Sequence, residues 1–182
     1  IPCHESREEI GAVLARVLEY FDPDHVVVAD NADSVDPPDD TAEIVAKISS
    51  RVRYLYIPQG HKTRALLHGT FELPPSCEYV LHLDDDTLLS SKGDMVFDEK
   101  HFDDPSVSAV TYGIRMLGDS IVAKCVDLEF LQFSLHRTTR SLLSTAFFCH
   151  GIVGLWKRDK WTERMAAHPS MPAARVLEPL EP

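Results

Sequence analysis

The stretch Tyr79-Val80-Leu81-His82-Leu83-Asp84-Asp85-Asp86-Thr87 joins a short apolar run to three consecutive aspartates. A short, mostly apolar run bounded by polar residues predicts a strand that is buried on both faces. Side chains alternate along a strand, so we expect Asp84 and Asp86 to point the same way while Asp85 points elsewhere. Two carboxylates on one side of a strand end can share a cation. The stretch therefore predicts a metal site formed by Asp84 and Asp86.

The residue types of this site suit Mg²⁺ or Mn²⁺. Both are hard ions that take oxygen ligands, and they commonly bind through one or two carboxylates together with substrate phosphates. A calcium loop is a weaker alternative, because the twelve-residue pattern with a central Gly and a terminal Glu is absent. The remaining alternative is a solvated turn. The position directly after a buried strand favours the metal site.

Strand and helix patterns alternate on both sides of the aspartates. Ser6 and Glu9 have the spacing of a capping box, which predicts the start of the first helix. In chain order we expect a helix over 6–20, a strand over 25–29, a helix over 41–50, a strand over 52–57, a helix over 61–71, a strand over 79–83, a strand over 107–112 and a long helical stretch over 121–144. This alternation predicts an α/β fold with a parallel sheet flanked by helices.

Polar clusters follow three of the predicted strands directly. They are Asp30-Asn31, Gln59-Gly60 and Asp84-Asp85-Asp86. In parallel α/β sheets the ligand binds outside the carboxyl ends of the strands. Three polar clusters at one edge of the sheet therefore predict a single binding site.

Composition narrows the class of protein. The chain has 182 residues, 44% of them hydrophobic, which fits one globular domain with a real core. Acidic residues outnumber basic residues 29 to 18, which argues against nucleic acid or an anionic membrane surface as a partner. The four cysteines form no C-x-x-C pair, so a zinc site has little support. No apolar run is long enough to span a membrane, and we expect the chain itself to be soluble.

With the aspartate triplet in place, the chain resembles the family 2 glycosyltransferases of the GT-A fold, and more narrowly the processive synthases of hyaluronan and chitin. Residues 1–6, Ile-Pro-Cys-His-Glu-Ser, resemble the opening apolar-Pro-x-x-Asn-Glu motif, with His4 in the place of Asn. The resemblance places Pro2 and Glu5 at the donor nucleotide. The chain opens on Ile1 rather than Met, so we expect a fragment of a larger protein.

Two more stretches resemble donor-binding motifs of that family. Residues 29–34, Ala-Asp-Asn-Ala-Asp-Ser, are similar to its Asp-Asp-Gly-Ser segment, which implies that Asp30 faces the uracil base. Residues 60–66 resemble its Gly-Lys-x-x-Ala-Leu stretch with one inserted residue, which implies that Lys62 neutralises phosphate charge. The resemblance also places Asp84 and Asp85 at the donor nucleotide.

A later segment, residues 149–158, resembles the Cys-x-Ser-Gly-Pro-x-Gly-x-Tyr-Arg segment of hyaluronan-type synthases. By that resemblance Gly151, Gly154 and Trp156 lie on the acceptor side. Tight packing is the alternative for glycines and a tryptophan in an apolar run. We therefore expect a GT-A domain over 1–167, divided into a nucleotide-sugar-binding part over 1–115 and an acceptor-side part over 116–167, followed by an irregular tail over 168–182.

The residue that should activate the acceptor has no counterpart in the sequence. In the resembled family the general base is the Asp of a Gly-Glu-Asp or Gly-Asp-Asp that follows the acceptor-side segment. Here the chain continues instead with residues 168–175, His-Pro-Ser-Met-Pro-Ala-Ala-Arg. Glu178 and Glu181 lie in a Pro-rich tail that does not hold a carboxylate in place. The catalytic base stays unknown, and we expect a GT-A fold that is incomplete on its C-terminal side.

These resemblances predict an inverting, metal-dependent enzyme that transfers a sugar from a UDP-sugar to a growing glycan. They also imply a membrane-embedded parent protein with its catalytic domain in the cytoplasm. One alternative is an inactive nucleotide-binding fragment, since the general base is missing. Another is a nucleotidyltransferase that makes sugar nucleotides, although its Gly-rich N-terminal loop is not visible.

Overall fold

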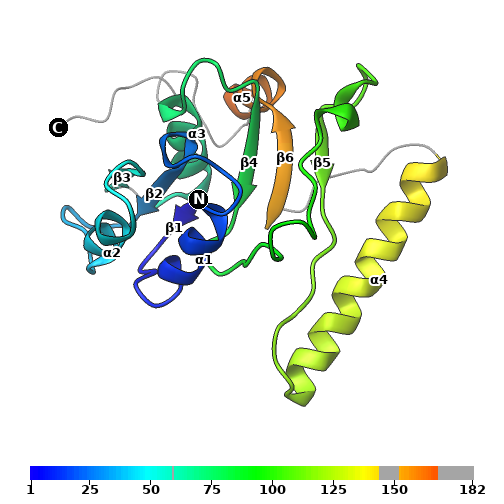
Figure 1. Ribbon diagram of the computed structural model, residues 1–182, viewed down its shortest axis with the longest axis horizontal. Coiled ribbons are helices and arrows are strands. Elements are labelled where there is room, and N and C mark those ends of the chain that lie inside the picture. The colour runs from blue at the N-terminus through cyan, green and yellow to red at the C-terminus, as the bar shows by residue number, and fades with distance from the viewer. Residues whose placement is uncertain (59, 144–151, 168–182) are drawn as a thin grey trace.

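Strands and helices alternate over the first half of the chain, as the sequence predicts (Figure 1). The computed structural model describes residues 1–58, 60–143 and 152–167. Its elements are β1 (Pro2–Cys3), α1 (Ile10–Val17), η1 (Pro23–His25), β2 (Val27–Asn31), α2 (Thr41–Ile48), β3 (Arg53–Ile57), α3 (Lys62–Glu72), β4 (Tyr79–Leu83), η2 (Glu99–Phe102), β5 (Ala109–Thr111), α4 (Ile121–Leu143), β6 (Val153–Lys157) and α5 (Arg158–Ala166). The predicted tail over 168–182 lies outside the described residues.

The first three strands form a parallel sheet in the order β1-β2-β3. All residues of β2 are buried, which agrees with the apolar run that predicts this strand. Helix α3 packs against β1 and β2, while α2 packs against α1 and β3. The predicted α/β fold with a parallel sheet flanked by helices is confirmed.

The other three strands form an antiparallel sheet in the order β4-β6-β5. Strand β6 lies between β4 and β5 and runs opposite to both (Figure 1). The alternation of strands and helices does not predict this antiparallel sheet. Strand β6 belongs to an apolar, glycine-containing segment, and it pairs with β4 although the two strands are far apart in the sequence. The strand predicted over 107–112 is present as the shorter β5.

Helix α1 begins later than its sequence pattern suggests. The helix starts at Ile10 rather than at Ser6, and the predicted capping box is wrong. The main-chain carbonyl of Ser6 accepts hydrogen bonds from the N–H groups of Glu9 (3.1 Å) and Ile10 (2.9 Å). The Ser6 hydroxyl instead donates to the carboxylate of Asp85. The turn is therefore closed by the main chain, and the Ser6 side chain serves a different contact.

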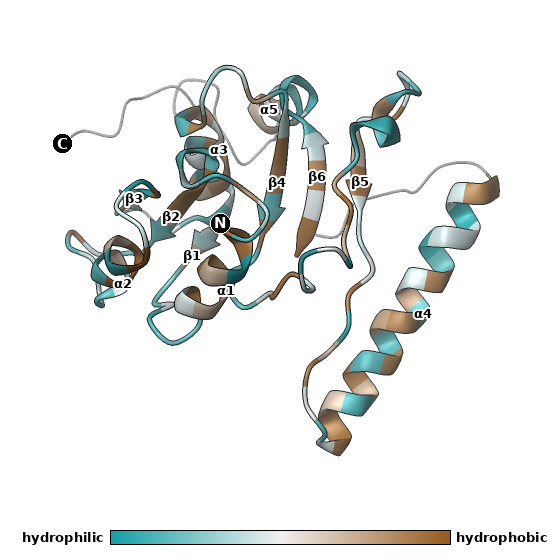
Figure 2. Ribbon diagram, viewed as in Figure 1, coloured by the Kyte–Doolittle hydropathy of each residue, from teal (hydrophilic) through white to brown (hydrophobic). Residues whose placement is uncertain are grey.

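The main core lies between α1 and the strands of both sheets. Its fully or nearly fully buried members include Ile10, Val13 and Leu14 of α1, Val28 of β2 and Leu83 of β4. Helix α4 lies apart from this core (Figures 1 and 2), and its apolar side chains are distributed around it. In the part of the chain that the structure describes, no helix is long and apolar enough to cross a membrane.

Arg158 joins the start of α5 to the end of α3. Its guanidinium donates hydrogen bonds to the main-chain carbonyls of Thr70 (3.0 Å), Leu73 (3.1 Å) and Pro74 (2.6 Å), and more weakly to that of Cys77 (3.4 Å). Carbonyls at the end of a helix have no partner within the helix and need one from elsewhere. Arg158 therefore fastens the last turn of α3, and the loop that leads into β4, to α5.

Replacing Arg158 by Ala is expected to lower the free energy of unfolding by about 2–4 kcal/mol, because several half-buried carbonyls lose a charged donor. The free energy is measured by urea denaturation. The control is Arg164→Ala, which removes an exposed arginine from the same helix and should change stability by less than about 0.5 kcal/mol. Equal effects of the two substitutions would show that Arg158 does not fasten α3.

Candidate functional site

Asp84 lies at the carboxyl end of β4, next to the first residue of α3. Its side chain is 16% exposed, and the ammonium of Lys62 lies 2.7 Å from its Oδ1 atom. Burial raises the pKa of Asp84 above its usual value, while the hydrogen bond and charge of Lys62 act in the opposite direction. The main-chain N–H of Asp84 donates to the carbonyl of Ile152 (2.9 Å), just before β6. Strands β4 and β6 and helix α3 thus fix this carboxylate.

Asp86 lies in the turn that follows. The Thr87 N–H closes the turn on the Asp84 carbonyl (3.1 Å), and the Thr87 hydroxyl donates to Asp86 Oδ1 (3.2 Å). The side chain of Asp86 is exposed, and its negative charge helps to raise the pKa of Asp84. The two carboxylates therefore lie close enough to influence each other's charge. Their proximity comes from a turn rather than from the side-chain alternation of a strand.

The carboxylates of Asp84 and Asp86 suit a metal ion that takes most of its ligands from water and substrate rather than from the protein. Among residues 1–58, 60–143 and 152–167 there is no group of three or more His, Cys, Asp or Glu side chains that could hold a metal. Mg²⁺ binds through one or two carboxylates and completes its coordination with water and substrate phosphates. The two aspartates fit such an ion, whose remaining ligands would come from a bound diphosphate and water.

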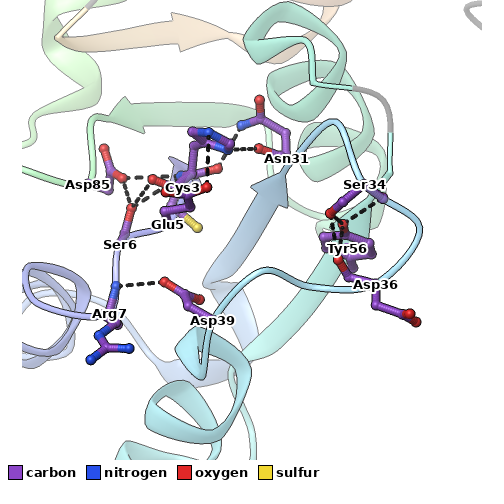
Figure 3. A network of polar contacts seen from close by, with 11 residues as sticks. Cys3, Glu5, Ser6, Arg7, Asn31, Ser34, Asp36, Asp39, Tyr56 and Asp85 are labelled. Carbon is purple, nitrogen blue, oxygen red and sulfur yellow. Dashed lines mark hydrogen bonds and ion pairs between the residues drawn. The ribbon is translucent and has the colours of Figure 1, made fainter.

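Asp85 faces the loop after β1 (Figure 3). Its Oδ2 atom accepts hydrogen bonds from the Ser6 hydroxyl and, at 3.4 Å, from the His4 main-chain N–H. Ser6 is 2% exposed, so the hydroxyl end of this contact is buried. Asp85 therefore ties the end of β4 to the end of β1. Its predicted contact with the donor stays a prediction.

The carboxyl end of β2 holds a buried carboxylate. Asp30 is 0% exposed, and its Oδ2 atom accepts a hydrogen bond from the Tyr54 hydroxyl (2.6 Å). Its Oδ1 atom has no hydrogen-bond partner within the described parts of the chain. Burial raises the pKa of Asp30, against the effect of the Tyr54 hydrogen bond. A nucleotide base can reach Asp30 only if the side chains that cover it move.

The loop between β1 and α1 is strained and tied to β2. Glu5 has a φ of +51°, in the left-handed region that costs a non-glycine residue about 1–2 kcal/mol. The His4 ring contacts the Asn31 carbonyl (2.5 Å), and the Asn31 amide donates to the Cys3 carbonyl (2.7 Å) (Figure 3). These contacts fix the loop that carries the exposed Glu5 at the edge where β1 and β2 end. Pro2, by contrast, is buried in β1.

The predicted acceptor-side residues lie in or near β6. Gly154 is buried and pairs with His82 of β4 and Thr111 of β5. The half-buried Trp156 ring packs against Trp161, with 5.0 Å between ring centroids. Packing thus explains both residues, and their acceptor role stays a prediction. Gly151 lies outside the described residues.

Two residues of this region were not predicted from the sequence. The apparent capping box assigned the Ser6 hydroxyl to a helix start, which concealed its contact with Asp85. Tyr54 reaches Asp30 from the neighbouring strand β3, and the register of β2 against β3 is needed to see that pairing. Both contacts depend on which strands lie side by side.

Comparisons with known proteins agree on the family and the fold. The family model described as glycosyl transferase family 2 matches residues 1–123. Poly-β-1,6-N-acetyl-D-glucosamine synthases of Staphylococcus aureus strains COL and MRSA252 are each 24% identical over 183 residues, covering 91% of this chain and 43% of the relative.

A solved structure extends the likeness to three dimensions. The mannosyltransferase of Pyrobaculum calidifontis, in complex with GDP-Man and Mn²⁺, aligns with a TM-score of 0.64 at 20% identity. The alignment covers 93% of this chain and 46% of that one. The likeness supports the predicted GT-A fold. The chain spans less than half the length of the relatives that it matches.

Proposed function

The chain belongs to glycosyl transferase family 2, and on this premise we propose that it forms the donor-binding half of an enzyme that transfers a sugar from a UDP-sugar to a growing glycan. The proposed reaction depends on Mg²⁺ or Mn²⁺ and inverts the anomeric carbon. The family match favours this enzyme over a nucleotidyltransferase. The narrower resemblance to hyaluronan and chitin synthases supports a membrane-embedded parent protein with this domain in the cytoplasm.

The contact between Lys62 and Asp84, beside Asp86, carries the proposal. The Lys62 ammonium lies 2.7 Å from the half-buried carboxylate of Asp84, and the carboxylate of Asp86 is nearby. The edge of the sheet thus presents one cationic and two anionic groups. A diphosphate with its metal presents the complementary charges. On binding, Lys62 would exchange Asp84 for a phosphate oxygen, while Asp84 and Asp86 would hold the cation.

Each group then has a defined part in the transfer. Asp84 and Asp86 would position the cation, which neutralises charge on the departing diphosphate. Lys62 would stabilise the same charge from the start of α3. The unpaired oxygen of Asp30 would accept an N–H of the base once the side chains that cover it move aside. The Mn²⁺ bound to the mannosyltransferase of P. calidifontis supports use of a divalent metal with this fold.

The proposal is tested by titrating the chain with UDP in a calorimeter, with and without Mn²⁺, and with GDP in parallel. We expect UDP to bind only weakly without the metal and clearly tighter with it. Tighter binding of GDP than of UDP would overturn the choice of nucleotide. An absence of metal-dependent binding with both would overturn the donor site. Release of UDP from a UDP-sugar, assayed separately, distinguishes an active domain from a chain that only binds.

Replacing Lys62 by Met is expected to change the two affinities in opposite directions. Mn²⁺ alone should bind about three- to tenfold tighter, because Asp84 loses a competing cation. UDP in the presence of Mn²⁺ should bind about tenfold weaker, a loss of ~1.4 kcal/mol, because a phosphate loses its ammonium partner. Calorimetry measures both affinities. Lys47→Met, which removes an exposed lysine of α2, is the control and should change neither. A Lys62 variant that binds both ligands as the parent does would contradict the proposed exchange.

A further inference from the structure

Asp30 uses only one of its two carboxylate oxygens in hydrogen bonding. Its Oδ2 atom accepts from the Tyr54 hydroxyl at 2.6 Å, whereas its Oδ1 atom is buried and has no hydrogen-bond partner among the residues that the structure describes. A buried polar atom without a partner is costly, more so when the group is charged, and such atoms are rare in folded proteins. The Oδ1 atom therefore marks a place that a hydrogen-bond donor from outside the chain can fill.

The pairing of the strands brings Tyr54 to Asp30. In the parallel ladder Val28 of β2 pairs with Tyr54 of β3, and Asp30 pairs with Tyr56. Side chains alternate along a strand, so Val28 and Asp30 lie on one face of the sheet, and Tyr54 lies on that same face. Cys3 of β1 pairs with Asp30 from the other side. The Tyr54 hydroxyl is therefore held against one oxygen of Asp30 by the sheet itself.

The Tyr54 hydroxyl donates this hydrogen bond and keeps its proton. Burial raises the pKa of Tyr54, and the hydrogen bond to Asp30 raises it further. The same hydrogen bond favours the charged form of Asp30, against the effect of burial on its pKa. An ionised carboxylate only accepts hydrogen bonds, and it does so through its two oxygens. With Oδ2 occupied by Tyr54, Asp30 presents one oxygen to a ligand.

The bases of nucleotides differ in how many donors they direct at a carboxylate. Uracil has a single N–H between its two carbonyl groups, and one carboxylate oxygen satisfies it. Guanine has an N1–H and a 2-amino group side by side, which together match both oxygens of one carboxylate. A guanine at Asp30 would either displace the Tyr54 hydroxyl or leave its own amino group without an acceptor. Both outcomes leave a buried donor unpaired, which lowers the affinity.

We propose that Tyr54 determines the base specificity of the donor site, because it occupies one oxygen of Asp30 and leaves a full set of partners for uracil but not for guanine. Tyr54 acts through Asp30 and does not itself touch the base, so it is a positioning residue. The inference rests on the proposed function, in which Asp30 meets the base after the side chains that cover it move aside. It adds the side chain that makes this carboxylate selective.

Inosine diphosphate isolates the effect of the second donor, since its base is guanine without the 2-amino group. The titrations are done with Mn²⁺ at pH 8, far above the ordinary pKa of a carboxyl group. Calorimetry on the unsubstituted chain should give an affinity for inosine diphosphate at least equal to that for GDP. Clearly tighter binding of GDP would show that the amino group finds an acceptor while Tyr54 is in place, and would overturn the proposal without any variant.

Tyr54→Phe removes the hydroxyl and frees the Oδ2 atom of Asp30. Relative to inosine diphosphate, GDP should bind this variant about tenfold more tightly than it binds the unsubstituted chain, because the amino group gains a charged acceptor. Tyr20→Phe is the matched control, since the Tyr20 hydroxyl donates to the carbonyls of Ser90 (2.9 Å) and Ser91 (2.6 Å) instead. Its loss should leave the ratio of the two affinities unchanged.

Binding of UDP to the unsubstituted chain separates this proposal from the donor site on which it rests. If UDP, GDP and inosine diphosphate all fail to show Mn²⁺-dependent binding, the donor site is refuted and the role of Tyr54 with it. If UDP binds with Mn²⁺ and the ratio of GDP to inosine diphosphate affinity is the same in Tyr54→Phe as in the unsubstituted chain, the donor site stands and the proposal for Tyr54 alone is overturned.

Discussion

Replacing Asp84 by Asn is expected to abolish the Mn²⁺-dependent part of UDP binding at the proposed donor site. The amide keeps the shape of the side chain but removes the charge that a hard cation requires. Loss of a mere outer-shell partner costs a metal site about 10–100-fold in affinity, so loss of a ligand should cost at least about 100-fold. The same is expected of Asp86→Asn. Calorimetric titration with UDP and Mn²⁺ measures both variants.

The control for this experiment is Asp94→Asn, which neutralises an exposed aspartate in the segment after β4. It should leave the affinity for UDP and Mn²⁺ unchanged. Burial raises the pKa of Asp84, so the neutral amide adds no cost of burying a charge at this position. An Asp84→Asn or Asp86→Asn protein with the parent's affinity would refute the corresponding ligand assignment.

The second large effect concerns His82, which is buried in β4. The residue is 7% exposed, its ring packs against Trp161 at 4.1 Å between centroids, and its Nε2 atom lies 3.4 Å from the Thr70 hydroxyl. Burial lowers its pKa from 6.5 to about 3, and the N-terminal charge adds to the effect. The folded protein therefore keeps His82 neutral at pH values where an unfolded chain protonates it.

The sign of the resulting pH dependence follows from proton binding. Between about pH 6.5 and 3 the unfolded chain binds a proton at His82 that the folded protein does not, so the free energy of unfolding falls as the pH falls through this range. The shift from 6.5 to about 3 corresponds to an upper bound of about 5 kcal/mol. We expect His82→Leu to remove this loss, as measured by urea unfolding at pH 7 and pH 4.5.

His136→Leu, on the exposed face of α4, is the control and should retain the full loss on acidification. Asp30 and Asp84 contribute in the opposite sense, because their raised pKa values favour the folded state as the pH falls. The contribution of Asp30 and Asp84 is the same in the parent, in His82→Leu and in His136→Leu, so it cancels when these proteins are compared. An equal loss of stability in the parent and in His82→Leu would contradict the prediction.

Local sequence patterns located the helices and strands of the first half of the chain, because hydrophobic periodicity is a property of neighbouring residues. The polar clusters after the strands predicted one site at this edge of the sheet, and the family resemblance placed Lys62 there beside Asp84. The contacts that depend on strand order were not predictable in this way. Ser6 meets Asp85 only because the ends of β1 and β4 lie together, and Tyr54 reaches Asp30 only because β3 lies beside β2.

The direction of β6 was beyond the same reasoning. A strand that follows a helix is expected to run parallel to its predecessor, and that expectation describes β1 to β3 well. Strand β6 enters between β4 and β5 from a segment whose glycine-containing, apolar pattern is compatible with several structures. The position and direction of β6 depend on its packing between β4 and β5, which its own residue pattern does not reveal.

The pairing of β4 with β6 also determines when the proposed metal site can form during synthesis. Leu83 pairs with Val153, and the Asp84 N–H with the Ile152 carbonyl, so the partner strand leaves the ribosome about seventy residues later. Pairings so distant in sequence form slowly. Until then β4 presents an open edge on which another nascent chain can pair. The aspartates of the proposed donor site therefore acquire their final positions late, after the parallel sheet and α3 have already been translated.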